Sequence, residues 1–240
     1  MLDFVATVLL TAAMVMNVNA VVSAMPVTRA QRLSLALAVG LWIGFVAASA
    51  SIGLPAVARP APMIGLYFAF PLVATALLAA FSPAARAAML GLPMPMLIGL
   101  NVSRVFGALF LLLAAAGRLG GPFPESAGWG DIVTGVVALP VAIMVVRGAA
   151  KSSRIPAWWN AFGALDLVVA VSLGIMSADG SPLQVFHAVT GPTPLTDLPY
   201  LFIPTVLVPF YLIVHAILFV QLRRAAEPGG IDGRVAGQPA

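Results

Sequence analysis

Residues Met94 to Ala116 read MPMLIGLNVSRVFGALFLLLAAA, an apolar run interrupted by a single charged side chain, Arg104. A helix needs about 20 apolar residues to cross the hydrocarbon core of a bilayer, so this run is long enough to span a membrane. A guanidinium at the centre of such a helix is costly in lipid, and it normally faces the protein interior, a partner or water. Arg104 therefore indicates both the class of fold and the first candidate for a functional residue.

The composition of the whole chain also indicates a membrane protein. Of its 240 residues, 61% are hydrophobic and only 8% are charged, whereas soluble domains contain about 25% charged residues. The net charge of +4 does not indicate a nucleic-acid-binding protein, because the basic residues lie in short loops between apolar runs. The chain contains no cysteine, which excludes disulfides, thiolate metal sites and cysteine catalysis.

Seven apolar runs are long enough, or nearly long enough, to cross a bilayer. The expected spans are Phe4–Met25, Leu33–Ala56, Met63–Ala80, Met94–Ala116, Gly130–Val146, Trp158–Ser177 and Tyr200–Leu222. Proline and glycine cluster between them and interrupt the helices. We therefore predict an all-α, polytopic transmembrane bundle over residues 1–224. The tail over residues 225–240 is short and rich in Gly, Pro and Ala, so we expect it to be disordered.

The charges of the loops predict the orientation of the bundle. One alternating set of loops, together with the tail, contains Arg29, Arg32, Arg86, Arg147, Lys151, Arg154, Arg223, Arg224 and Arg234. The other set contains only Arg59 and Arg118. Because cytoplasmic loops are enriched in Lys and Arg, we expect the N-terminus outside and the C-terminus in the cytoplasm. We predict a multi-pass protein of the cell membrane and expect this to be the bacterial inner membrane.

Two short sequence matches suggest an internal repeat. The segment VSAMPV at residues 22–27 resembles VVALPV at 136–141, and the pattern Tyr-x-x-x-Pro-x-Val begins at both Tyr67 and Tyr200. Each match pairs helices of the same expected direction, which suggests a 3+1+3 arrangement of two parallel units around the fourth helix. Chance similarity is the alternative, since Ala, Val and Pro are abundant. The arrangement resembles sugar transporters and opsins in outline, but the only lysine, Lys151, falls in a loop and cannot bind retinal in the last helix.

A few polar residues lie well inside the expected spans. At about 1.5 Å per residue they fall in the cytoplasmic half of the membrane or near its midplane. They are Asn17, Asn19, Asn101, Arg104, Asp166 and His215. One hypothesis is a polar cavity in which Arg104 binds a small polar or anionic solute, Asp166 is the counter-charge and His215 carries protons. The alternative is a structural Arg104–Asp166 ion pair, with the asparagines bonding between helices.

A second, weaker group of polar residues is expected on the outer face. It consists of Glu125, Asp131 and His187. The spacing of these residues matches no recognised metal-ligand motif, so we predict no metal site. Asp131 follows the sequence Gly128-Trp129-Gly130, and we interpret it as a cap at the outer end of the fifth span. With only two histidines at different depths, we also expect no haem and no other cofactor.

Three functions are compatible with these observations. The first is a transporter or permease for a small solute, with a site around Arg104 and Asp166. The second is a membrane enzyme acting on a lipid or another apolar substrate, for which only Asp166 and His215 are available as acid–base groups. The third is a non-catalytic partner or sensor protein in which the polar residues only fix helix packing. The sequence contains no phosphate-binding loop and no motif of a zinc or serine hydrolase, which favours the first function over an enzyme.

Overall fold

The structure is a computed structural model that describes residues 1–57, 60–148 and 153–226 of the chain. Within these ranges every regular element is helical, which confirms the predicted all-α class. In the described part of the chain, seven helices are long and apolar enough to cross a membrane, as the sequence predicts. The expected tail over residues 225–240 lies outside the described residues apart from its first two, which belong to the last helix.

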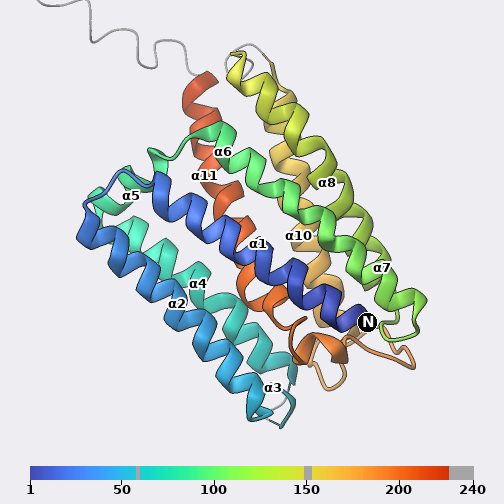
Figure 1. Cartoon of the computed structure of the whole chain (residues 1–240). Helices are drawn as coiled ribbons and strands as arrows, with labels where there is room; N and C mark the ends of the chain where they lie inside the picture. The colour runs from blue at the N-terminus through green and yellow to red at the C-terminus, as the bar shows by residue number, and fades with distance from the viewer. Residues whose placement is uncertain (58–59, 149–152, 227–240) are drawn as a thin grey trace, which may run out of the picture.

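The helices run alternately up and down the bundle (Figure 1). The membrane-spanning elements are α1 (Leu2–Ala24), α2 (Arg29–Ser51), α4 (Pro60–Phe81), α6–η1–α7 (Met94–Leu100, Asn101–Gly107 and Ala108–Ala115), α8 (Phe123–Val146), α10 (Ile155–Ser177) and η3–α11 (Ile203–Leu207 and Val208–Ala226). Among the described residues, three short helices lie in the connections: α3 (Leu54–Val57), α5 (Pro83–Leu90) and η2 (Thr193–Thr196). The N-terminus and the end of α11 lie at opposite ends of the bundle.

Each of the seven spans differs by at least one residue from the bounds that the sequence predicts, and the second runs over Arg29–Ser51 rather than Leu33–Ala56. The fifth span begins at Phe123 rather than at Gly130, and the seventh begins at Ile203 rather than at Tyr200. The start of α8 was missed because Glu125 lowers the local hydropathy, although an acidic residue in the first turn is itself typical of a helix start. As a result, the residues around Gly130 lie two turns deeper in the bundle than expected.

The fourth span is not a continuous α-helix. The segment η1, which carries Arg104, forms a tighter 3₁₀-helix between α6 and α7. Two of its side chains bond to carbonyls of the preceding turn: Asn101 Nδ2 donates to Leu97 at 3.1 Å, and Ser103 Oγ donates to Leu100 at 2.7 Å. Such bonds compete with the regular backbone pattern of a helix. A 3₁₀ stretch in the middle of a helix often marks a hinge or a functional position.

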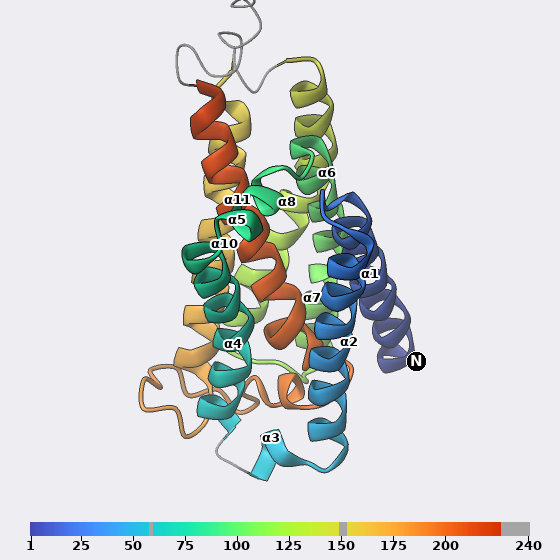
Figure 2. The same ribbon diagram turned by 90° about the vertical axis from the view of Figure 1, so that its left-hand side faces the viewer.

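Helix α8 lies between two groups of helices and contacts both of them. It packs against α6, η1 and α7 on one side and against α10 on the other. α11 runs through the middle of the bundle and packs against α10 and α4. α2 and α4 lie away from α8 (Figures 1 and 2): α1 packs against both α2 and η1, whereas α4 packs against α11 and η3. The segment η1 is therefore covered by α8 on one side and by α1 on another.

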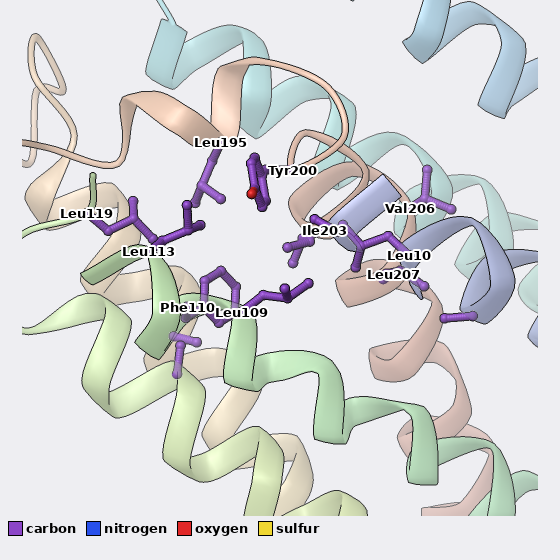
Figure 3. Close-up of a cluster of buried hydrophobic side chains, with 14 of the residues drawn as sticks. Leu10, Leu109, Phe110, Leu113, Leu119, Leu195, Tyr200, Ile203, Val206 and Leu207 are labelled. Carbon is purple, nitrogen blue, oxygen red and sulfur yellow. The ribbon is translucent and has the colours of Figure 1, made fainter. Parts of the chain in front are cut away.

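A cluster of buried apolar side chains closes the end of the bundle that holds the N-terminus, here called the amino-terminal end. Leu10 of α1, Leu109 of α7 and Ile203 of η3 meet there (Figure 3). Polar contacts seal the same end, because Asp3 Oδ1 accepts hydrogen bonds from Arg118 Nη1 at 2.7 Å and from the Tyr200 hydroxyl at 2.8 Å. Apolar packing and this surface ion pair therefore hold α1 against the rest of the bundle.

The charged residues at the two ends of the bundle differ in sign. Element order places Arg29, Arg32, Arg86, Arg147, Arg154, Arg223 and Arg224 at the opposite, carboxyl-terminal end. The amino-terminal end contains Asp3, Glu125, Asp179 and Asp197, with Arg118 as its basic residue among those described. The asymmetry agrees with the loop charges read from the sequence. The orientation in a membrane and the internal repeat remain predictions.

Candidate functional site

Four spans meet at the guanidinium of Arg104, whose side chain has no solvent exposure. Its Nε donates to Oδ1 of Asp131 at 2.7 Å, and Nη2 donates to Oδ2 of Asp166 at 2.5 Å. Nη1 donates to the backbone oxygen of Gly163 at 3.0 Å and contacts Nε2 of His215 at 3.1 Å. We call Arg104, Asp131, Asp166 and His215 the arginine cluster. Its contacts with both acids are direct and leave no room for a solute between Arg104 and either carboxylate.

The interpretation of Asp131 as an outer cap is wrong. α8 begins at Phe123, so Asp131 lies eight residues into the helix, or about 12 Å along its axis. It therefore faces Arg104 in the interior instead of capping the helix. The sequence does not reveal this role, because the predicted fifth span begins at Gly130, seven residues after the actual start of α8 at Phe123.

His215 is held in one tautomer by its neighbours. An arginine N–H can only donate, so Nε2 of His215 must accept from Arg104, and the imidazole is neutral with its proton on Nδ1. That Nδ1 then donates to Oδ1 of Asn160 at 2.8 Å, while Asn160 Nδ2 donates to the backbone oxygen of His215 at 3.1 Å. The Trp159 ring packs 5.6 Å from the imidazole. Both ring nitrogens are occupied, so this arrangement offers no site for a further proton on His215.

A second polar chain joins the arginine cluster to α1. The Tyr211 ring lies under the guanidinium of Arg104, with 5.8 Å between the Arg104 Cζ and the ring centroid. Its hydroxyl lies 2.7 Å from Ser103 Oγ and accepts a hydrogen bond from Asn17 Nδ2 at 3.1 Å. Ser103 Oγ also donates to a backbone carbonyl, so the Tyr211 hydroxyl is the donor to Ser103. Asn17 thus bonds between helices, whereas its own Oδ1 is buried without a partner.

The other predicted site residues lie apart from the arginine cluster. Asn101 is fully buried on η1, but its amide bonds to the preceding turn and its Oδ1 has no partner. Asn19 is exposed on α1, so its placement in the interior is wrong. Glu125 and His187 are both exposed at the amino-terminal end, where the sequence reasoning placed them.

Glycines allow the helices to approach closely around Arg104. A Cβ on Gly130 would collide with the carboxylate of Asp166, and a Cβ on Gly107 would collide with the side chain of Asp131. A Cβ on Gly163 would lie 2.7 Å from Cε1 of His215. Small residues at helix crossings are a common way to pack membrane helices. These three glycines are part of the site, and the sequence reasoning did not identify them.

A cavity of about 220 Å³ lies beside the arginine cluster, between α4, α8, α10 and η3. Its walls are mostly apolar and include Phe68, Phe110, Leu167, Val171 and Ile203. Asp131 lines this cavity, and its side chain is 16% exposed, compared with 8% for Asp166. A second carboxyl group, that of Asp179, lines the cavity from the exposed loop at the amino-terminal end. Asp131 is therefore the member of the arginine cluster that an occupant of the cavity would meet.

An irregular turn forms one wall of the cavity. η3 is a π-helical turn that contains Pro204, and both Ile203 and Pro204 line the cavity. The Trp42 indole N–H from α2 donates to the backbone oxygen of Thr205 at 3.1 Å. Single π-helical turns inside α-helices are frequent at functional sites. The two irregular segments, η1 and η3, thus lie next to the arginine cluster and the cavity.

One family model matches the chain. It is described as "Domain of unknown function (DUF8737)" and covers residues 61–223. This range contains all four residues of the arginine cluster and begins after α2. Neither a curated protein nor a solved structure matches the chain. Because the model covers well over half of the sequence, the chain belongs to the family of the domain of unknown function DUF8737.

Proposed function

We propose that this protein is a membrane-embedded carrier that binds a small amphipathic solute in the cavity beside Asp131. The main support for this proposal is that the walls of the cavity are mostly apolar and include one carboxyl group deep in the bundle, that of Asp131. Such a site suits a molecule with an apolar body and a polar head that donates hydrogen bonds to Asp131. Ligand sites generally combine mostly apolar walls with a few polar groups that fix orientation.

The size of the cavity limits the solute. Its volume of about 220 Å³ is below the ~300–1,000 Å³ of sites for drug-sized ligands. At about 30 Å³ per water molecule in the liquid, it corresponds to roughly seven waters. A molecule of about that many non-hydrogen atoms fits, as does the end of a longer chain.

The contacts of Arg104 argue against the anionic solute that the sequence suggested. Four of its N–H groups already have partners, which are Asp131, Asp166, Gly163 and His215. A guanidinium has five N–H donors, so little capacity remains for an anion. Arg104 instead supports a binding function indirectly, because it holds Asp131 at the cavity.

The irregular helices favour a carrier over a static binding protein. η1 interrupts the fourth membrane-spanning helix, and η3 forms the irregular first turn of the seventh. Non-helical backbone at membrane depth is tolerated where it is buried or lines a cavity, and many transporters bind solutes at such interruptions. An enzyme is less well supported, because the cavity presents Asp131 without the buried and doubly bonded His215.

Photolabelling tests the proposed site. The probe is a diazirine analogue of 1-hexanol, applied to the protein in lipid nanodiscs and mapped by peptide mass spectrometry. We expect labels on α4 and α10 beside the cavity, with excess unlabelled 1-hexanol competing. Gly174 lines the cavity, and a Cβ there has ordinary 3.6 Å contacts, so Gly174→Leu should place its side chain in the cavity. Labelling should then fall about tenfold through steric exclusion.

Gly44→Leu is the matched control, because it is the same substitution on the exposed surface of α2, where a Cβ meets nothing within 4 Å. It should label like the wild-type protein. Equal labelling of the Gly174→Leu variant, or labels spread evenly over the lipid-facing helices, would refute the proposed site.

A further inference from the structure

The charges of the arginine cluster do not balance. One guanidinium faces two carboxyl groups, those of Asp131 and Asp166, at hydrogen-bond distance. Arginine is always protonated in proteins, so two ionised carboxylates would leave one uncompensated negative charge. A buried charge of this kind is strongly disfavoured and is neutralised by a proton or a counter-ion.

The groups around Asp131 supply no second positive charge. On η1 the facing group is Arg104 itself, and on α10 it is Asp166. α11 contributes the neutral His215 and the uncharged hydroxyl and ring of Tyr211. α4 contributes apolar side chains and Gly65 to the cavity, and the loop contributes another acid, Asp179. The missing charge must therefore come from outside these side chains.

We infer that the solute carries a positive charge, and that its cationic head replaces one proton held by Asp131 and Asp166 when the cavity is empty. This inference rests on the proposed function, which it extends from a polar head to a small apolar amine. One ammonium enters, one proton leaves, and the total charge of the cluster and its occupant stays constant. The two carboxyl groups share the proton as a coupled pair, because both contact the same guanidinium.

The surroundings favour an organic ammonium over a metal ion. Divalent ions such as Ca²⁺ require six or more oxygen ligands. Among the described residues, no group of three or more His, Asp or Glu is placed to hold a metal. The apolar walls instead suit the hydrocarbon part of an amine, which would place its ammonium against Asp131.

A positive charge also explains why the solute would need a carrier. A small neutral molecule with an apolar body dissolves in the bilayer and can cross it unaided. A charged group in the hydrocarbon region is costly. If the ammonium enters as the proton leaves, the negative charge of the second carboxylate is always balanced, either by the proton or by the ammonium.

The first experiment measures proton release from the wild-type protein. The protein in nanodiscs is titrated with n-hexylamine or with 1-hexanol in weak buffer containing a pH indicator dye, and bound ligand is measured in parallel by competition with the photolabel. A primary amine stays charged between pH 5 and 8, as a lysine side chain does. We expect about one proton released per bound hexylamine and none per bound hexanol, because the two cations compete for one site.

The same competition gives the pH dependence. With rising pH the bound proton becomes easier to displace, so hexylamine affinity should rise by up to about tenfold per pH unit until the cluster is empty of protons. Hexanol affinity should not change with pH.

Variants separate Asp131 from the other acids. Asp131→Asn keeps an oxygen for Arg104 and mimics the protonated side chain, so proton release should disappear and the advantage of hexylamine over hexanol should fall about tenfold. Glu125→Gln removes an exposed acid from the same helix and should release protons like the wild-type protein. Hexylamine that binds without proton release, or no more tightly than hexanol at any pH, would overturn the inference. If neither compound competes with the photolabel, the proposed function itself is wrong.

Discussion

At the scale of the residue, a single side chain connects four membrane-spanning segments. Arg104 on η1 bonds to Asp131 on α8, to Gly163 and Asp166 on α10 and to His215 on α11. In an environment without water, burying any of these polar groups without its hydrogen-bond partner has a large cost in free energy. The cluster is therefore the strongest polar constraint on the helix arrangement, and through Asp131 it also contributes a carboxyl group to the wall of the cavity.

Removing the guanidinium should make stability strongly dependent on pH. In Arg104→Met the two carboxyl groups lose their partner, which for a buried pair costs about 3–5 kcal/mol. The folded variant must keep Asp131 and Asp166 protonated, whereas the unfolded chain ionises them at neutral pH. Because the folded state then binds more protons, stability falls as pH rises. Thermal unfolding in one detergent at pH 5 and pH 7.5 should show the larger loss at pH 7.5.

The triple variant Arg104→Met, Asp131→Asn, Asp166→Asn is the control for this prediction. It contains no charge in the cluster, so it should recover most of the stability and lose the added pH dependence. A triple variant as unstable and as pH-sensitive as Arg104→Met would mean that the loss comes from packing around the arginine and not from charge.

Residue depth explains what the sequence could reveal about this site. Arg104 and Asp166 were identifiable because each is an isolated charge inside a long apolar run. Asp131 was not, because its depth depends on where α8 begins, and hydropathy defines helix starts poorly. Asn19 shows a different limit of the sequence. Its depth along α1 can be estimated from its position, but the sequence does not show that its side chain lies on the exposed face of the helix.

At the scale of the element, the number and order of the spans follow from apolar length, but the irregular turns do not. Nothing in the run from Met94 to Ala116 distinguishes a 3₁₀ segment at its centre from a continuous α-helix. The Asn101 and Ser103 side chains bond to the preceding turn, and η1 also packs closely on α8. The apolar pattern of a single sequence carries little information about either contact.

The crossing of α8 and α10 depends on the absence of a side chain at Gly130. A methyl group there would collide with the Asp166 carboxylate, so Gly130→Ala must displace the acid or separate the helices. Overpacking of this kind typically costs about 1–3 kcal/mol. We expect a lower unfolding midpoint for Gly130→Ala in thermal unfolding in detergent. Gly99→Ala on α6, where a Cβ meets nothing within 4 Å, should leave the midpoint unchanged or raise it slightly. Equal midpoints for the two variants would show that the crossing tolerates a side chain.

At the scale of the whole molecule, the bundle is asymmetric along its axis. Seven described arginines lie at the carboxyl-terminal end, whereas the charged residues described at the amino-terminal end are four acids and Arg118. The cavity is closer to the acidic end, since residues of the loop between α10 and η3 also line it. If the arginine-rich end faces the cytoplasm, the solute that we propose would enter the cavity from the outer side, where the exposed Asp179 lines it.

The lack of cysteine makes this orientation directly measurable, because one introduced thiol is the only reactive group of its kind. Val189 is fully exposed in the loop at the amino-terminal end, and Ala84 is exposed on α5 at the carboxyl-terminal end, so Val189→Cys and Ala84→Cys report on the two ends. With arginine-rich loops in the cytoplasm, a membrane-impermeant maleimide should label Val189→Cys in intact cells and Ala84→Cys only after permeabilisation. The permeabilised sample controls for thiol reactivity. The reverse pattern would place the acidic end in the cytoplasm, and the cavity beside Asp131 would then be reached from inside the cell.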